Sequence, residues 1–281
     1  MNSTKLSELF TVSTNAEGQD WINIVINQQC SFLNRKCIKS RKSQPEISIG
    51  TCTVKYGKND VIICPHRLLE KRKIFIDSIH LLTLHEPGNE LHVISEVSIP
   101  GGSIDYILVS AKDNKVKDFV GIELQTLDTT GTVWPERQRF LKSLNIEVAD
   151  SDSDSVKPYG MNWKMTAKTI LVQLHHKIQT FEHLSKHLVL VVQDCLLDYM
   201  QKEFSFSHIS KNAKVGDSMH FHSYQLKEKD NGFHLSLHER MSTDSAGISK
   251  CMGLQAEANV ELDIILKTLE SKISARTLFS I

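Results

Sequence analysis

The chain has 281 residues, and its 33 lysine and arginine residues balance 33 aspartate and glutamate residues, so the formal net charge is zero. With 40% hydrophobic residues it has the composition of a globular protein of one elaborated domain or two, which excludes a small disulfide scaffold and a long repeat array. The polar N-terminus resembles neither a secretion signal nor a transit peptide, and no apolar run is long enough to cross a membrane, so we expect a cytoplasmic protein with no membrane partner.

Basic residues are concentrated near the start of the chain. Between Ser31 and Phe75, eleven basic residues accompany only three acidic ones, which gives a local net charge of +8. A basic region on a neutral chain favours a polyanionic partner on one face of the molecule. A solvated, lysine-rich surface is the alternative that charge alone leaves open.

Four of the six cysteines lie in this region or directly before it, namely Cys30, Cys37, Cys52 and Cys64. Thiols stay reduced in the cytosol, so four clustered cysteines predict a closed tetrahedral metal site rather than disulfides. No C-x-x-C pair is present, and four small buried hydrophobic residues are the alternative. We expect an N-terminal region with this metal-binding lobe at residues 1–66 and a larger core at 67–281.

After the cysteine region, hydrophobic periodicity predicts a short strand at 61–63 and a helix at 68–82. Two β-branched segments at 103–109 and 118–126 read as strands. The polar residues 112–115 lie between these segments, which together are typical of a β-hairpin.

The second half of the chain alternates between helical and strand patterns. Pro135 stands at a plausible first position of a helix over 135–144, and the acidic, serine-rich segment 150–155 predicts an exposed linker. The remaining expected elements are a helix at 167–181, strands at 187–192, 221–226 and 233–237, and a final helix with Leu262, Ile265, Leu266, Leu269 and Ile273 on one face. The fold class that we expect is therefore mixed α/β.

Acidic side chains gather on the predicted hairpin. Side chains alternate along a strand, so Glu123 and Gln125 share one face, and Asp105 near the start of the neighbouring strand can lie beside them. Two carboxylates and a further oxygen suit Mg²⁺, which activates water and stabilises charge during phosphodiester hydrolysis. Glu96 can add an acidic oxygen from a preceding helix, or it is a surface glutamate. The alternative for the whole group is a hairpin with polar residues on its solvated face.

The acid, hairpin and Glu-x-Gln pattern resembles the PD-(D/E)XK nucleases, in which lysine usually stands where this chain has Gln125. The specific resemblance is to the NotI-like restriction endonucleases, which combine a Glu-x-Gln strand with an N-terminal four-cysteine metal lobe. It covers about residues 25–200, with anchors at 48–52, 64–67, 121–125 and 160–166. A glutamine can orient water by hydrogen bonds, but it cannot supply the positive charge of a lysine.

This resemblance implies a fold, a reaction and partners. The fold is a PD-(D/E)XK nuclease core with a mixed central sheet flanked by helices, preceded by the cysteine lobe. The activity implied is that of a type II restriction endonuclease, a homodimer of a restriction-modification system that cuts both strands of a GC-rich palindrome. It also implies Mg²⁺ at Asp105, Glu123 and Gln125, and iron, or otherwise zinc, in the four-cysteine site.

Duplex DNA requires basic side chains for its phosphates and base edges. The candidate DNA contacts are Arg35, Lys36, Arg41 and Lys42 in the cysteine lobe, Arg137 and Arg139 after Pro135, and Lys164 and Lys168 near the start of the predicted helix.

Two other functions compete with cleavage. A metal-stapled DNA-binding protein without catalysis explains the cysteines and the basic region, but it leaves Asp105 and Glu123 without a task. A zinc hydrolase is suggested by His220-x-His222 and by His234 and His238, although the order is not H-E-x-x-H and alternation predicts a strand there.

Overall fold

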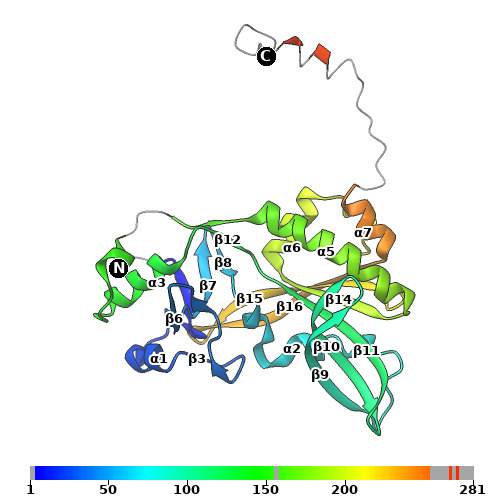
Figure 1. Ribbon diagram of the computed structural model, residues 1–281, viewed down its shortest axis with the longest axis horizontal. Coiled ribbons are helices and arrows are strands. Elements are labelled where there is room, and N and C mark those ends of the chain that lie inside the picture. The colour runs from blue at the N-terminus through cyan, green and yellow to red at the C-terminus, as the bar shows by residue number, and fades with distance from the viewer. Residues whose placement is uncertain (1–3, 155–157, 254–265, 268–269, 272–281) are drawn as a thin grey trace.

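The computed structural model describes residues 4–154, 158–253, 266–267 and 270–271. Its centre is a mixed sheet of six strands in the order β16-β15-β14-β11-β10-β9 (Figure 1). Strands β9, β10 and β11 are antiparallel neighbours, β11, β14 and β15 run parallel, and β16 returns antiparallel to β15. The bounds of these strands are β9 Glu90–Ile99, β10 Gly102–Lys112, β11 Lys115–Gln125, β14 His187–Gln193, β15 Met219–Lys229 and β16 Gly232–Thr243.

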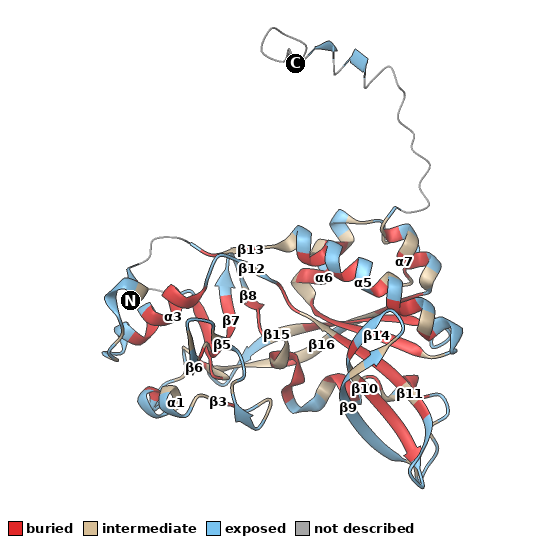
Figure 2. Cartoon of the chain, viewed as in Figure 1, coloured by how far each residue is buried: buried red, intermediate tan, exposed pale blue. Residues whose placement is uncertain are grey.

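The predicted hairpin is confirmed in β10 and β11. Its turn residues Asp113 and Asn114 both have positive φ, at 51° and 58°, as a tight hairpin turn requires, and Asp and Asn tolerate that conformation better than other residues with a side chain. The mixed α/β class and the later strands are confirmed as well. Among them β14 is buried along its whole length, whereas β9 is mostly exposed at the edge of the sheet (Figure 2).

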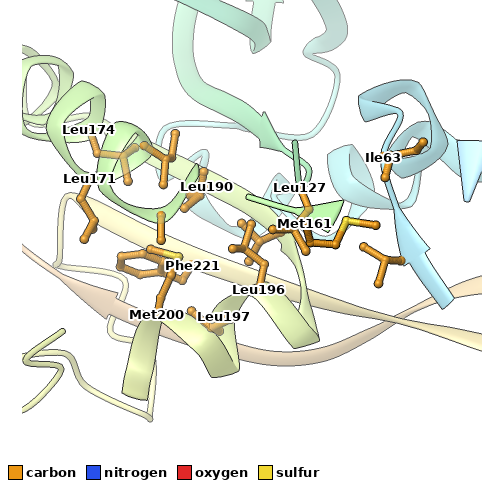
Figure 3. Close-up of a cluster of buried hydrophobic side chains, with 14 of the residues drawn as sticks. Ile63, Leu127, Met161, Leu171, Leu174, Leu190, Leu196, Leu197, Met200 and Phe221 are labelled. Atoms are coloured by element: carbon orange, nitrogen blue, oxygen red, sulfur yellow. The ribbon is translucent and has the colours of Figure 1, made fainter. Parts of the chain in front are cut away.

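Helices α5, α6 and α7 gather on one side of the central sheet (Figure 1). Leu171 and Leu174 of α5 pack with Leu197 of α6 and Phe221 of β15 in one buried cluster (Figure 3). Ile63, which follows strand β8, belongs to the same cluster and links the N-terminal region to it. The helices of the second half have the bounds α3 Trp134–Ser143, α4 Asp150–Ser153, α5 Trp163–His183, α6 Asp194–Glu203 and α7 Ser245–Cys251. A short antiparallel pair joins β12 Thr129–Thr130, which precedes α3, to β13 Gly160–Met161, which precedes α5.

The N-terminal region forms a second sheet in the order β2-β1-β7-β8. Its elements are β1 Leu6–Leu9, β2 Val12–Ser13, α1 Trp21–Asn27, β7 Thr51–Tyr56 and β8 Asn59–Ile62, with two small hairpins made by β3 Gln29–Cys30 and β4 Arg35–Lys36, and by β5 Ser40–Arg41 and β6 Gln44–Ser48.

Arg67 ties this region to the central sheet. Its side chain is only 1% exposed, and its Nε lies 2.8 Å from Oε2 of Glu8 on β1. Its Nη1 lies 2.7 Å from Oε2 of Glu70, and its Nη2 donates to the carbonyl of Phe233 on β16 at 2.7 Å. Because removing one member leaves a buried charge unpaired, this network fixes the two regions to each other. The division at residue 66 stays a prediction.

Two expected elements differ in the structure. The helix expected at 68–82 is broken into η1 Pro65–Arg72, α2 Lys73–Ile76 and η2 Ile79–Leu81, because Lys71 and Arg72 have positive φ and the Glu70 carboxylate accepts the backbone N–H of Leu235 at 2.7 Å. The expected linker at 150–155 begins with α4, where Asp152 pairs with Arg41, while residue 155 lies outside the described residues.

The final helix expected around Leu262 to Ile273 lies outside the described residues, apart from 266–267 and 270–271. None of the helices that the structure describes is long and apolar enough to cross a membrane.

Two buried histidines on β15 predict acid sensitivity. Burial lowers the pKa of His220 to about 4 and, with the nearby Arg240, holds the pKa of His222 well below its usual value. Their rings also face those of His187 and His80. An unfolded chain takes up protons on these histidines below about pH 6.5, whereas the folded chain keeps both rings neutral. The stability of the fold is therefore at its full value above about pH 6.5 and decreases as the pH falls toward 4.

We expect His222→Leu to flatten this pH dependence, because neither ring nitrogen of His222 has a hydrogen-bond partner within the described part of the chain and leucine can replace it without losing a bond. Thermal unfolding at pH 7 and pH 5 measures the effect, at roughly 2–4 °C of Tm for each kcal/mol. The exposed His238→Leu is the control. Equal pH slopes in wild type and His222→Leu would contradict the assignment.

Candidate functional site

The carboxylates of the hairpin meet where β10 and β11 separate. Regular pairing continues up to Tyr106 and Ile122. Beyond this pair, the backbone N–H of Leu124 donates to Oδ2 of Asp105 at 2.8 Å. The Asp105 side chain therefore takes the place of a backbone acceptor and lies beside the end of β11, next to Glu123.

Glu123 is buried, with 5% of its surface exposed, and its Oε1 lies 2.8 Å from Nζ of Lys177 on α5. Burial raises the pKa of Glu123 to about 7, and the charge of Asp105 adds to the increase, while Lys177 and the backbone amide of Asp105 oppose it. A carboxylate that is both buried and close to a like charge is poised to gain from a further cation.

Gln125 and Glu96 have looser connections to this pair. Gln125 follows Glu123 on the same face of β11, and its Nε2 donates to the carbonyl of Thr126 at 2.6 Å. Glu96 lies on strand β9, so the expectation that it comes from a helix is wrong. In the register of β9 and β10 it stands opposite Asp105, between the pairs Ser95–Tyr106 and Val97–Ile104, and it is exposed.

The donor set fits a hard, oxygen-binding cation. Mg²⁺ commonly takes one or two protein carboxylates and completes its shell with water and substrate phosphate oxygens. Asp105 and Glu123 supply that number. In the described part of the chain no three His, Cys, Asp or Glu side chains form a ready metal site, so a metal at the pair would depend on such outside oxygens.

A cavity of about 170 Å³ joins this site to the cysteine region. Glu96 and Asp105 line it from the central sheet, and Arg35 and His66 line it from the N-terminal side. The Arg35 side chain therefore shares a cavity with Asp105, so a phosphate bound there would contact a positive charge. Of the candidate DNA contacts, Arg35 is the one that lines this cavity.

The four clustered cysteines also come together. Cys30 ends β3, Cys37 follows β4, Cys52 lies on β7 and Cys64 precedes η1, and all four line one small cavity of about 10 Å³. That volume holds about one water-sized sphere. Four sulfur donors around one such space have the chemistry of a structural zinc or iron site, although their side chains do not form a ready metal geometry among the described residues.

Two thiols of this cluster interact directly. A hydrogen bond from Cys52 lowers the pKa of Cys64, with a further contribution from His66, whose Nδ1 lies 3.8 Å from the Cys64 sulfur. The pKa of Cys52 is raised well above its usual value by the same contact and by burial. One thiol of the cluster is therefore favoured as the thiolate that binds metals.

The candidate DNA contacts fall into two groups. Six are exposed, and five of these make no ion pair within the described part of the chain: Arg35, Lys36, Lys42, Lys164 and Lys168. The other three are engaged with the protein. Arg41 makes a two-pronged pair with Asp152 at 2.9 Å, Arg137 is 3% exposed and donates to the carbonyl of Ile49, and Arg139 bonds Glu136 at 2.7 Å.

Sequence reasoning missed Lys177. It lies on the buried face of α5 with Leu174, Ile178 and Phe181. A lysine at helical spacing within an apolar stripe was the available signal, because such a side chain needs a buried partner. The histidines that suggested a zinc hydrolase lie on strands β15 and β16, where His234 contacts Glu70 at 3.3 Å.

Comparison with known protein families gives a match over most of the chain. The model of one protein family, described as restriction endonuclease NotI, matches residues 29–237, which include the cysteine cluster, both carboxylates and Lys177. No curated protein matches the chain. The match covers well over half of the 281 residues. The chain therefore belongs to the NotI restriction endonuclease family, whose members are site-specific deoxyribonucleases.

Proposed function

We propose that this enzyme hydrolyses phosphodiester bonds in both strands of duplex DNA with Mg²⁺ bound by Asp105 and Glu123. The observation that carries the proposal is the meeting of these two carboxylates at the separating ends of β10 and β11, inside the segment that matches the family. Acidic residues on a solvated hairpin repel one another and would separate, and burial of Glu123 disfavours its charged form. A bound cation would offset that cost.

In this proposal each residue has a separate task. Bound Mg²⁺ would lower the pKa of a water and neutralise charge on the phosphate. Asp105 and Glu123 would hold it, with the Asp105 carboxylate oriented by the Leu124 amide. Gln125 would orient water or phosphate through hydrogen bonds, and Glu96, opposite Asp105, would supply a further oxygen acceptor at the entrance.

DNA binding is proposed to use the five exposed basic residues that make no ion pair within the described residues. Phosphate contacts position a duplex without reading its sequence, and lysine suits them as a compact charge. A target of GC-rich palindromic sequence, cut by a homodimer in which each copy serves one strand, is the finer part of the proposal, supported by family membership and by the match between two-fold DNA and two-fold protein. A cytoplasmic location within a restriction-modification system completes it.

The cysteine cluster is proposed to hold one structural iron or zinc ion. The four thiols line one cavity and come from segments with little regular structure, which a shared ion would join. The same segments contribute Arg35 and His66 to the cavity beside Asp105. The ion would thus hold the N-terminal wall of the active site in place.

Replacing either carboxylate tests the active site. We expect Asp105→Asn and Glu123→Gln each to reduce cleavage at least about 100-fold, because each loses a ligand charge, while duplex binding in Ca²⁺ remains measurable. Incubation with large unmethylated genomic DNAs, in Mg²⁺ and in EDTA, followed by sequencing of fragment ends, measures both rate and site. Asp113→Asn, at the tip of the same hairpin, is the control. Full activity in either site variant would refute the assignment, and binding without Mg²⁺-dependent cutting by wild type would favour the non-catalytic DNA-binding function.

Removing one thiol tests the cysteine cluster. We expect Cys52→Ser to lose bound metal and to lower Tm substantially, because three thiolates close the site poorly. Elemental analysis of the purified protein gives the metal identity and stoichiometry, and Cys195→Ser, outside the cluster, serves as the control. Stable Cys52→Ser protein with unchanged metal content would show that the clustering is incidental.

A further inference from the structure

Lys177 stands out as the one charged group that faces Glu123 from helix α5. Its Nζ lies 2.8 Å from Oε1 of Glu123, and the two side chains are 9% and 7% exposed. No task was assigned to this lysine above. Two buried charges at such a distance cost desolvation on both sides, so the pair calls for an explanation beyond stability.

The packing of α5 brings Lys177 to this place. A Cβ at Gly121 on β11 would meet the ring of Phe181 on α5, so a larger residue there would force this aromatic side chain to move. A Cβ at Gly101, where φ is +95°, would lie 2.7 Å from the carbonyl oxygen of His176. A glycine on β11 and a glycine in the turn between β9 and β10 thus let α5 lie beside Glu123.

The turn between β9 and β10 also encloses the lysine. A Cβ at Gly102, where φ is +138°, would lie 3.2 Å from Cε of Lys177, and the Thr180 hydroxyl of α5 donates to the carbonyl of Pro100 at 3.0 Å. The ammonium therefore has little freedom to turn toward solvent. It is held against the Glu123 carboxylate.

Position 125, two residues along the same strand face from Glu123, is a neutral glutamine whose amide bonds the main chain of Thr126. The strand itself thus brings no positive charge to the acidic pair. The only other charged groups placed at the site by the described residues are Asp105, Glu96 and Arg35. Lys177 is the cation in contact with a carboxylate of the pair.

We propose that Lys177 is a positioning residue of the active site, which fixes the Glu123 carboxylate from helix α5 and supplies there the positive charge that strand β11 lacks. This inference rests on the proposed nuclease function and assigns to it a residue outside the hairpin. Because the ammonium shares Glu123 with any bound metal, it weakens metal binding to the free protein and at the same time keeps Glu123 in the orientation that cleavage needs.

The two effects predict opposite changes in one variant. We expect Lys177→Met and Lys177→Gln to bind Mn²⁺ at least about fivefold more tightly in the absence of DNA, because a competing charge is gone, and yet to cleave at least about 100-fold more slowly. Lys177→Arg keeps the charge and should stay within about threefold of wild type in Mn²⁺ affinity. Mn²⁺ binding is followed by electron paramagnetic resonance of the free ion, and cleavage by single-turnover kinetics.

The matched control is Lys186→Met. Lys186 pairs with Asp118 at 2.6 Å, near the other end of β11, so its loss removes a comparable ion pair from the same strand away from Asp105. We expect it to lower stability without changing Mn²⁺ affinity or cleavage. If Lys177 served only to stabilise the fold, its neutral variants would likewise lower stability and leave Mn²⁺ affinity and cleavage unchanged.

Several results would overturn the inference. They are unchanged cleavage in Lys177→Met or Lys177→Gln, metal affinity and cleavage that fall together, and a Lys177→Arg variant as altered as the neutral ones. Since two neutral variants of different shape are used, failure of one to fold leaves the other informative. If wild type does not cleave DNA in Mg²⁺, the nuclease proposal itself fails, and this outcome is distinct from normal cleavage by the lysine variants.

Discussion

A buried negative charge on the central sheet is the constraint around which the structure is arranged. Glu123 lies in the middle strands, where burial and Asp105 both oppose its ionisation. The ammonium of Lys177 offsets part of this unfavourable energy. A lysine on a helix can reach the strand in this way only if the helix packs closely against it. Gly121 and Gly101 permit that approach. The close approach of α5 to β11 and to the turn after β9 thus gives the buried Glu123 carboxylate a cationic partner.

A second buried network decides how the cysteine region is attached. Arg67 bonds Glu8 of β1, Glu70 and the backbone of β16, so three segments distant in the sequence share one guanidinium. Ile63 adds an apolar link in the same direction. An N-terminal region on a flexible tether could not place Arg35 beside Asp105 reproducibly. The buried arginine makes the N-terminal region one wall of the candidate active site.

The hairpin and its carboxylates were predictable because they depend on local pattern. Alternation places Glu123 and Gln125 on one face, and the Asp-Asn turn fixes the register that brings Asp105 near them. The helix expected at 68–82 is interrupted at Lys71 and Arg72, which have positive φ. The neighbouring Glu70 accepts a hydrogen bond from the backbone of β16, and hydrophobic periodicity cannot reveal such a long-range contact. Lys177 was missed for a related reason: its partner lies on another element, and only the packing of α5 on β11 brings the two together.

The candidate DNA contacts divide into two kinds of basic residue, and the chemistry of arginine and lysine explains the division. Arg41 and Arg137 stack their guanidinium groups on Trp134 at 4.7 and 4.6 Å and bond acceptors of the protein. A planar, weakly hydrated guanidinium is suited to such interior use, whereas an ammonium is strongly hydrated and stays in water unless a carboxylate holds it. Most of the candidate contacts left on the surface are therefore lysines. A duplex bound by them would be held through its phosphates, and sequence readout would then fall to Arg35 and to groups outside the predicted set.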